Sequence, residues 1–192
     1  MRDRDKGGQA RAVGTGTTDG GATRDRAAAG AGAGAGDAVA VRPARPDDLD
    51  AVAALDARAT GVAKPDYWRA VFAVYVTGAP GRVAFAAERG GTVVGYCLGE
   101  VRSWEFGSPP CGWVFALNVA PGLREGGVGT RLFGAACDAF RAAGVASVRT
   151  MVARDAGLLL SFFRAQGMTA GPFVQLEAPL APAAADGTQT ES

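Results

Sequence analysis

Apolar side chains between residues 38 and 180 recur with two different periods, one typical of helices and one typical of strands. In 49–59 and again in 66–77 they return every three or four positions, which is the spacing of one face of a helix. Asp47 or Asp48 is suited to cap the first of these helices, and Pro65 stands where the second begins. A short apolar strand, 38–42, precedes both helices.

The next part of the chain predicts a sheet. Residues 83–88 and 93–101 are strand-like runs joined by Arg89-Gly90-Gly91-Thr92, which suits a hairpin turn. The nearly continuous apolar run 113–119 is expected of a strand covered on both faces. The remaining predicted elements are a helix at 127–143, a strand at 147–152, a helix at 156–165 capped by Asp155, and a final strand at 169–177.

The predicted order is therefore β-α-α-β-β-β-α-β-α-β. An α/β fold follows, with a mixed central sheet and helices on both of its faces. This domain spans 38–180. The flanking segments 1–37 and 181–192 hold too little apolar surface to offset the entropy of ordering the chain, so both are expected to be disordered tails.

Charge and composition narrow the function. The formal net charge is +1, which gives no support to nucleic-acid binding. Histidine is absent, so triads and metal sites that use histidine are excluded. The three cysteines, Cys97, Cys111 and Cys137, are too scattered for a disulfide framework or a zinc site, and no metal is expected. Cys111, between Pro110 and Gly112, is the one candidate for a reactive loop thiol.

The chain contains no apolar run of the roughly 20 residues that a membrane span needs. Its first residues, Met1-Arg2-Asp3-Arg4-Asp5-Lys6, lack the hydrophobic region of a secretory signal. We therefore expect a cytoplasmic protein without a membrane partner.

The stretch 116–130 carries the most specific chemistry. A buried strand ends near Pro121, a glycine-rich turn follows, and an amphipathic helix begins. The free N–H groups of such a helix start, together with the helix dipole, can bind a pyrophosphate. Gly127 and Gly129 would let that ligand approach the backbone, and Arg124 and Thr130 would add a charge and a hydroxyl. Purely structural glycines explain the turn about equally well.

Two nucleotide-binding motifs are excluded at this turn. A P-loop requires Gly-Lys-Ser/Thr, and the turn contains no lysine. A dinucleotide fingerprint requires a third glycine where Leu132 stands.

Asn118-Val119-Ala120-Pro121, followed by Arg124-x-x-Gly127-x-Gly129, resembles the acetyl-CoA-binding motif of the GNAT acetyltransferases. The likeness extends in the right order from Val39 to Glu177. Its other parts are Val41-Arg42-Pro43-Ala44 with Asp47-Asp48-Leu49, the hairpin strand Thr92-Val93-Val94-Gly95-Tyr96, and the late helix from Asp155 through Ser161-Phe162-Phe163-Arg164-Ala165-Gln166-Gly167-Met168.

The resemblance implies acetyl-CoA as co-substrate and direct transfer of its acetyl group to a primary amine of a small molecule or peptide. It also implies a bulge near Leu117-Asn118-Val119, where a backbone amide would polarise the thioester carbonyl. Homodimers are common in the family, so a homodimer is possible here. The residues implied to bind the cofactor are Leu117, Asn118, Val119, Arg124, Glu125, Gly126, Gly127, Val128, Gly129, Thr130 and Phe163.

The catalytic groups depart from the family pattern. Phe163 stands where the family often has a tyrosine that protonates the leaving thiolate, and Ala156 replaces its asparagine. The candidate general base is Glu100, with Glu105 as the alternative, although a solvated charge explains Glu100 at least as well. These departures keep a second hypothesis open, a non-catalytic acyl-CoA-binding regulatory or sensor domain. Aromatic residues that either line an acceptor pocket or belong to the core are Tyr67, Trp68, Tyr75, Trp104 and Phe106.

Overall fold

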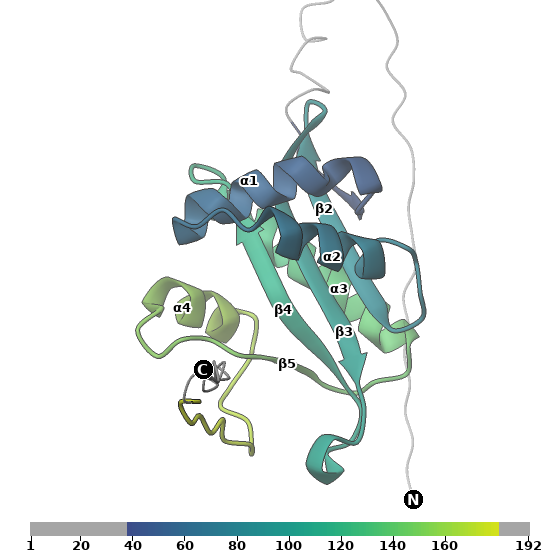
Figure 1. Ribbon diagram of the computed structural model, residues 1–192, viewed down its shortest axis with the longest axis vertical. Helices are drawn as coiled ribbons and strands as arrows, with labels where there is room; N and C mark the ends of the chain where they lie inside the picture. The colour runs from purple at the N-terminus through teal and green to yellow at the C-terminus, as the bar shows by residue number, and fades with distance from the viewer. Residues whose placement is uncertain (1–37, 181–192) are drawn as a thin grey trace, which may run out of the picture. The chain divides into compact units, whose positions relative to one another are not determined.

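A mixed sheet forms the centre of the protein in the computed structural model, which describes residues 38–180 (Figure 1). The two predicted tails lie outside the described residues. Within residues 38–180 the sheet has five strands in the order β1-β2-β3-β4-β5, in which β1 to β4 are antiparallel and β5 runs parallel to β4. The strands are β1 Ala40–Pro43, β2 Arg82–Arg89, β3 Thr92–Arg102, β4 Cys111–Val119 and β5 Val148–Thr150.

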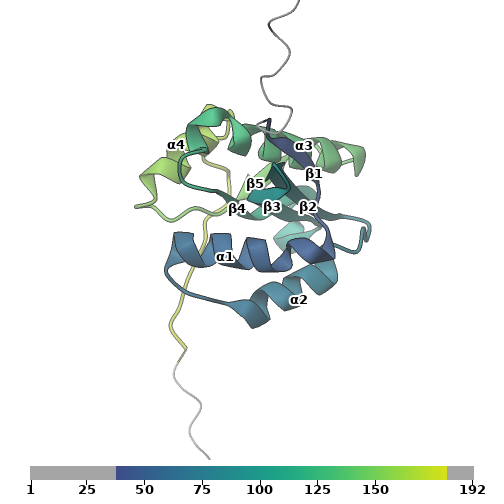
Figure 2. The same ribbon diagram turned by 90° about the horizontal axis from the view of Figure 1, so that it is seen from above.

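Helices cover both faces of this sheet (Figure 2). One face carries α1 and α2, whose apolar residues pack with Tyr96 and Leu98 of β3. The opposite face carries α3 and α4, which pack with Val114 of β4. The mixed sheet and the two helical layers that the sequence predicts are thus confirmed. The helices are α1 Leu49–Thr60, α2 Pro65–Tyr75, α3 Val128–Ala142 and α4 Gly157–Ala165, with short 3-10 turns η1 Pro46–Asp48, η2 Glu105–Gly107 and η3 Arg124–Gly126.

The final strand predicted at 169–177 is not formed. The segment is irregular, and Val174 and Leu176 are exposed. Pro172 has no N–H to donate to a ladder, and Gly171 before it favours irregular backbone. The alternation of apolar and polar residues in this segment therefore does not lead to strand pairing.

Neither predicted helix cap forms a capping hydrogen bond with its side chain. Asp48 does occupy the N-cap position of α1, but its carboxylate accepts hydrogen bonds from the Arg42 guanidinium at 2.7 and 2.8 Å and from the backbone N–H of Arg45. The N-cap of α4 is Ala156, without a side-chain hydrogen bond, so Asp155 does not cap that helix. An ion pair with a strand residue competes successfully with the local cap in the first case.

Glycines bring α3 close to the sheet. A Cβ at Gly112 of β4 would overlap the Phe140 ring of α3, and a Cβ at Gly99 of β3 would stand 2.8 Å from Phe140 Cζ. Phe140 is 2% exposed, and its ring packs closely against these two strands. Among residues 38–180, no helix has the length and apolar character required to cross a membrane.

Candidate functional site

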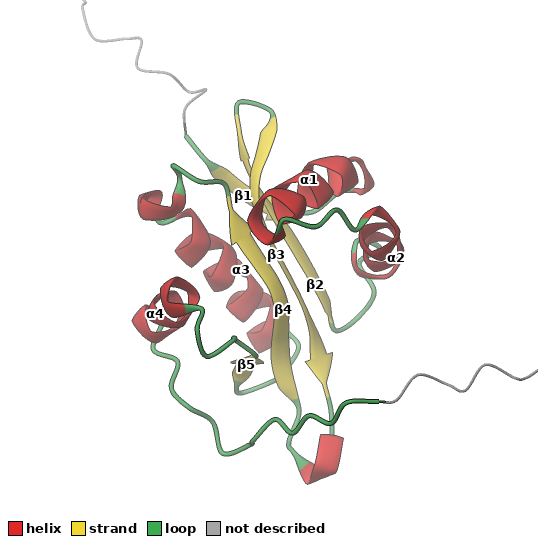
Figure 3. Cartoon of the chain, turned by 60° about the vertical axis from the view of Figure 1, so that its left-hand side comes forward, coloured by secondary structure: helices red, strands yellow, loops and turns green. Residues whose placement is uncertain are grey.

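Only the first half of β4 is paired on both sides. The register with β5 runs from Gly112↔Val148 to Val114↔Thr150, and β5 ends there. Figure 3 shows β5 beside β4 well short of the end of that strand. From Phe115 to Val119, therefore, β4 keeps its β3 partner but has passed the end of β5.

A bulge lies where this second half begins. Leu98 of β3 pairs with Ala116, whereas Gly99 pairs with Val114, so Phe115 is the extra residue. The resemblance placed the bulge near Leu117-Asn118-Val119, slightly later than the structure does. A bulge bends its strand, which is consistent with the parting of β4 from β5 at this point.

The alternation of the ladder decides which backbone groups of β4 face the open side. The Ala120 N–H donates to the Val94 carbonyl at 2.8 Å, so Ala120 and every second residue before it bond to β3. The backbone N–H and C=O groups of the residues in between, Val119 and Leu117, point away from β3. Val119 is engaged locally: its N–H donates to Asn118 Oδ1 at 2.9 Å, and its carbonyl accepts from Arg124 Nε at 3.2 Å. Leu117 is thus the residue of this half-strand whose N–H and carbonyl face the edge that β5 leaves.

The end of β4 leads through η3 into the N-terminus of α3. Gly127 has φ +68°, a left-handed conformation that suits glycine, and its carbonyl accepts the first helical bond, from Arg131 N–H at 3.1 Å. The N–H groups of Val128, Gly129 and Thr130 come before that bond and so have no acceptor within the helix. They form the positive end of the helix dipole, where an anion is favoured.

The two glycines of the motif have different surroundings. A Cβ built on Gly127 would meet no atom within 4 Å, so this residue leaves space in front of the helix. A Cβ on Gly129 would stand 3.1 Å from Phe162 Cε2 of α4 and 3.7 Å from Val119 Cγ2. Gly127 thus leaves room for a ligand near its backbone, whereas a side chain at Gly129 would crowd Phe162 of α4. Ligand binding at both glycines stays a prediction.

The other residues expected at this turn surround the helix start. Arg124, Glu125 and Gly126 form η3 and are exposed. The bond from Arg124 Nε to the Val119 carbonyl holds the guanidinium across the turn. The Thr130 hydroxyl accepts a hydrogen bond from Gln166 Nε2 at 3.2 Å, which links the start of α3 to the end of α4.

Phe163 lies in the core. Its side chain is 5% exposed, and its ring makes edge contacts with Phe133, at 5.6 Å between centroids, and with Phe162, at 5.1 Å. The ring fixes α4 on α3. A contact of Phe163 with the cofactor stays a prediction.

Both oxygens of the candidate base Glu100 accept hydrogen bonds. Oε2 accepts from the Tyr75 hydroxyl at 2.7 Å and from Arg82, and Oε1 accepts from Arg102 Nε at 3.0 Å. The alternative, Glu105, is 58% exposed in η2, and its Oε1 lies 3.9 Å from Arg102 Nε. The structure therefore brings both carboxylates to Arg102.

Glu100 belongs to a row of side chains that sequence reasoning missed. Arg82 of β2 pairs with Glu100 of β3, Glu100 with Trp113 of β4, and Trp113 with Arg149 of β5. The guanidinium of Arg102, two residues after Glu100, stacks over the Trp113 ring at 4.3 Å. We call these five residues the cross-strand row. Only the register brings them together, and the sequence does not show it.

Asn118, for which a cofactor contact stays a prediction, ties β4 to α1 with its amide. Its Nδ2 donates to the Leu55 carbonyl at 3.1 Å. Nearby Asp56 accepts from Trp68 Nε1 at 3.0 Å and pairs with Lys64 at 2.8 Å. Burial raises the pKa of Tyr96 in this cluster, and the Asp56 charge adds to the shift.

The remaining sequence candidates divide by exposure. Trp68 is a core residue at 1% exposed, whereas Trp104 and Phe106 are exposed and both have positive φ. Cys111 is buried at the start of β4, which argues against a reactive loop thiol. Burial raises the pKa values of Cys97 and Cys137, so both thiols stay protonated at neutral pH.

Comparisons with known proteins agree with this geometry. The chain aligns over 76% of its length and 97% of the other chain, at 17% identity and TM-score 0.67, with an aminoglycoside N-acetyltransferase, AAC(6')-Iy, in complex with CoA. A 6'-N-acetyltransferase from Acinetobacter baumannii aligns at 15% identity and TM-score 0.63, covering 75% of this chain and 100% of that one.

A transcriptional regulator from Bacillus halodurans gives TM-score 0.63 at 17% identity, covering 74% of this chain and 100% of the other. At these identities the likeness shows a shared fold. A search of curated proteins finds no match. The model of the acetyltransferase (GNAT) family matches residues 49–168, more than half of the sequence. The chain belongs to the GNAT family of acetyltransferases.

Proposed function

We propose that the protein transfers the acetyl group of acetyl-CoA to a primary amine by direct attack. The observation that carries the proposal is the continuity of two binding features. The open backbone edge at Leu117 leads, through one short turn, to the free N–H groups at Val128, Gly129 and Thr130. A strand edge suits an extended amide-containing arm, and a helix start suits a pyrophosphate.

Each feature has a defined role in this proposal. The N–H groups at the start of α3 and the exposed Arg124 bind the pyrophosphate of CoA, for which Gly127 leaves space. The Leu117 N–H donates to the thioester carbonyl and stabilises the negative charge that develops on its oxygen during attack. Acetyl-CoA supplies the activated acyl thioester.

Transfer forms a C–N bond between the amine and the acetyl carbon. The C–S bond breaks, and its electron pair leaves with the CoA sulfur as a thiolate. Phe163 has no proton to give this thiolate, so the proposal relies on its own stability as a leaving group. Because Glu100 already accepts bonds on both oxygens, we assign it to holding Arg82 and Arg102, and the ammonium proton passes to water.

A second function, binding of acyl-CoA without turnover in a regulatory or sensor domain, is favoured by two observations. Phe163 is a buried packing residue, and the carboxylate expected to act as base is engaged by arginines. Under either function the acceptor class, a cytoplasmic location and a homodimer stay predictions.

Thermal unfolding tests both functions. Acetyl-CoA at 100 times its Kd is expected to stabilise the protein by about 2.7 kcal/mol, whereas the folded protein without any shift would contradict both. Release of CoA thiol is then measured with polyamines, aminoglycosides, amino acids and peptides. Turnover of any amine supports the enzyme, and binding without turnover of all of them supports the sensor.

A further inference from the structure

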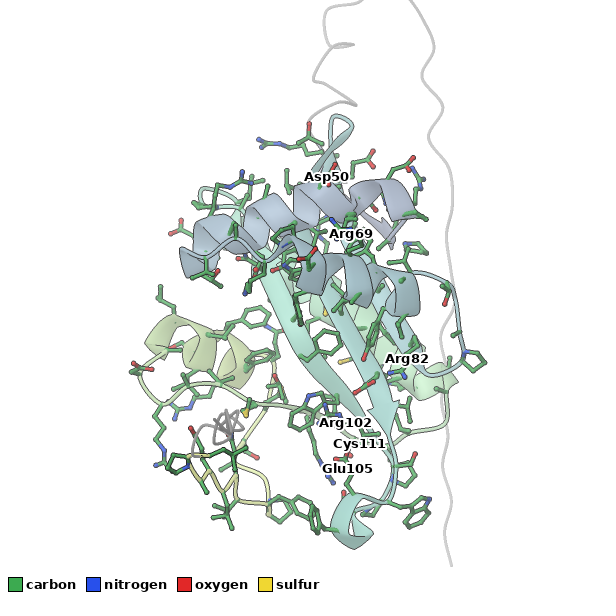
Figure 4. The ribbon with its side chains drawn as sticks, in the orientation of Figure 1. Asp50, Arg69, Arg82, Arg102, Glu105 and Cys111 are labelled. Carbon is green, nitrogen blue, oxygen red and sulfur yellow. The ribbon has the colours of Figure 1, made fainter. Side chains whose placement is uncertain are left out.

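The cross-strand row lies on the face of the sheet that α1 and α2 cover only in part. Leu98 packs with these two helices, and Glu100 and Arg102 follow it at alternate positions, so their side chains project from the same face. Residues in register across strands also share a face, which places Arg82, Trp113 and Arg149 there. Figure 4 shows Arg82 and Arg102 toward the end of the sheet away from α1.

Arginines outnumber carboxylates here: the row holds three guanidinium groups and one carboxylate, and the exposed Glu105 beside Arg102 adds a second carboxylate. Arg82 and Arg102 are 34% and 32% exposed along their side chains, whereas the Glu100 carboxylate between them is 17% exposed. Glu100 is occupied on both oxygens, and Arg149, whose NH1 donates to Ser108 Oγ, adds a third guanidinium. An incoming ligand therefore meets guanidinium N–H donors beside an aromatic ring.

The row borders the place where the proposed function puts the thioester. The Trp113↔Arg149 pair is adjacent to the last pair of β4 with β5, Val114↔Thr150. The bulge residue Phe115 follows at once, and its ring contacts that of Tyr75 at 4.9 Å between centroids. The Tyr75 hydroxyl, in turn, donates to Glu100. One ligand of modest length can thus reach both the row and the open half of β4.

We infer that the acceptor is a small primary amine that also carries an oxyanion, a carboxylate or a phosphate, bound by Arg82, Arg102 and Arg149. This inference rests on the proposed function and narrows its acceptor. Guanidinium groups donate paired hydrogen bonds to such oxyanions, and Trp113 shields the bonds from water. A polyamine or an aminoglycoside would bring further positive charge to a site that is already cationic, which is unfavourable.

Amines of matched length and similar basicity test the inference in the unmodified protein. Thiol release at saturating acetyl-CoA is measured with γ-aminobutyrate, n-butylamine and putrescine, and separately with O-phosphoethanolamine and ethylamine. We expect kcat/KM to be roughly tenfold higher for each oxyanionic amine than for the alkylamine that lacks the oxyanion, and lowest for putrescine. The ratio within each set shows whether carboxylate or phosphate fits better.

Equal rates, or a preference for putrescine, would overturn the inference and leave the acetyltransferase proposal standing. A shift in melting temperature with acetyl-CoA, without thiol release from any of these amines, would overturn the inference. Thiol release with an aminoglycoside or a peptide would then still support the enzymatic proposal, and its absence with the whole amine panel would overturn that proposal as well.

Substitutions locate the effect. Arg102→Gln and Arg149→Gln are each expected to lower kcat/KM for the oxyanionic amine by about tenfold, with little change for the alkylamine that lacks the oxyanion. Arg141→Gln is the matched control, because this arginine is exposed on α3 and pairs with Asp138. The stabilisation by acetyl-CoA should be the same in all three variants. Equal losses in kcat/KM for the oxyanionic amine and for the alkylamine that lacks the oxyanion would contradict the assignment.

Discussion

The two ends of β4 contribute different kinds of groups to the proposed site: one contributes backbone groups and the other contributes side chains. From Leu117 onward the strand and the turn behind it offer backbone groups, which any sequence able to adopt this path would provide, and the proposed ligand contacts there depend little on side chains. Toward its first half the same strand takes part in the cross-strand row, where arginines from three strands meet. The first end suits a ligand shared by a whole family. The second end can change with a few substitutions, so we expect the specificity for the acceptor to be set there.

The largest expected effect concerns the packing beneath the row. Gly112→Ala places a Cβ inside the Phe140 ring, and we expect a loss of about 3 kcal/mol in the free energy of unfolding, measured by urea denaturation. Gly126→Ala, in the turn of the cofactor end, is the control, because its Cβ would meet no atom within 4 Å. Equal stabilities of the two variants would show that the two ends do not differ in packing as described.

The ion pair of Asp48 tests whether charge elsewhere serves folding rather than binding. Hydrogen bonds from Arg42 lower the pKa of Asp48 below its ordinary value of 3.8, against the opposing effect of burial. Asp48→Asn should therefore cost about 2 kcal/mol of stability at neutral pH.

The pH dependence of that loss follows from the lowered pKa. The carboxylate stabilises the folded state above the pKa of the unfolded chain, and this contribution disappears as the pH falls through the pKa of the folded state. The free energies of unfolding of the unmodified protein and of Asp48→Asn should thus differ by a constant amount above about pH 5 and converge in acid. A constant difference down to low pH would contradict the ion pair as its source.

At the cofactor end, Arg124→Gln removes the one charged side chain assigned to the pyrophosphate. The backbone donors remain, so we expect the Kd of acetyl-CoA to rise only about tenfold, or roughly 1.4 kcal/mol. Titration calorimetry at several salt concentrations measures this, and the difference should shrink as salt increases. A loss of all binding would show that this end depends on side chains as much as the other.

The smallest effect is expected for Glu100→Gln. If the carboxylate only holds the arginines, the pH–rate profile stays in place, and KM for an oxyanionic amine falls by about threefold because one negative charge has been removed. Initial rates across pH check both points. Loss of an ionisation from the profile would instead identify Glu100 as the general base.

The sequence predicted the parts of this protein that depend on local patterns. The helical spacing in α1, α2 and α3, and the turn from β4 to α3, were visible because each lies within a short segment. The family resemblance added acetyl-CoA as the expected co-substrate. Where local pattern met a tertiary constraint, prediction failed: Asp48 is used by Arg42 rather than by its own helix, and Pro172 prevents the last strand.

The cross-strand row was out of reach for a different reason. Arg82, Glu100, Trp113 and Arg149 are brought together by register across four strands, and register is fixed by packing of whole faces rather than by any one segment. The local pattern marks Glu100 alone and does not show its arginine partners or the hydrogen bonds that both of its oxygens accept. The bulge at Phe115 was likewise placed slightly too late, since the position of an extra residue depends on both strands.

The open half of β4 also bears on how the protein avoids aggregation. A strand with unpaired backbone groups at the rim of a sheet is a template for aggregation, because another chain can add to it. Here the stretch from Ala116 to Val119, which among residues 38–180 has no strand partner on the side away from β3, follows the bulge at Phe115 and a half-strand paired with β5, so a foreign strand cannot continue along it past Val114. The stretch of β4 at which another strand could add is therefore short enough for a small ligand to cover.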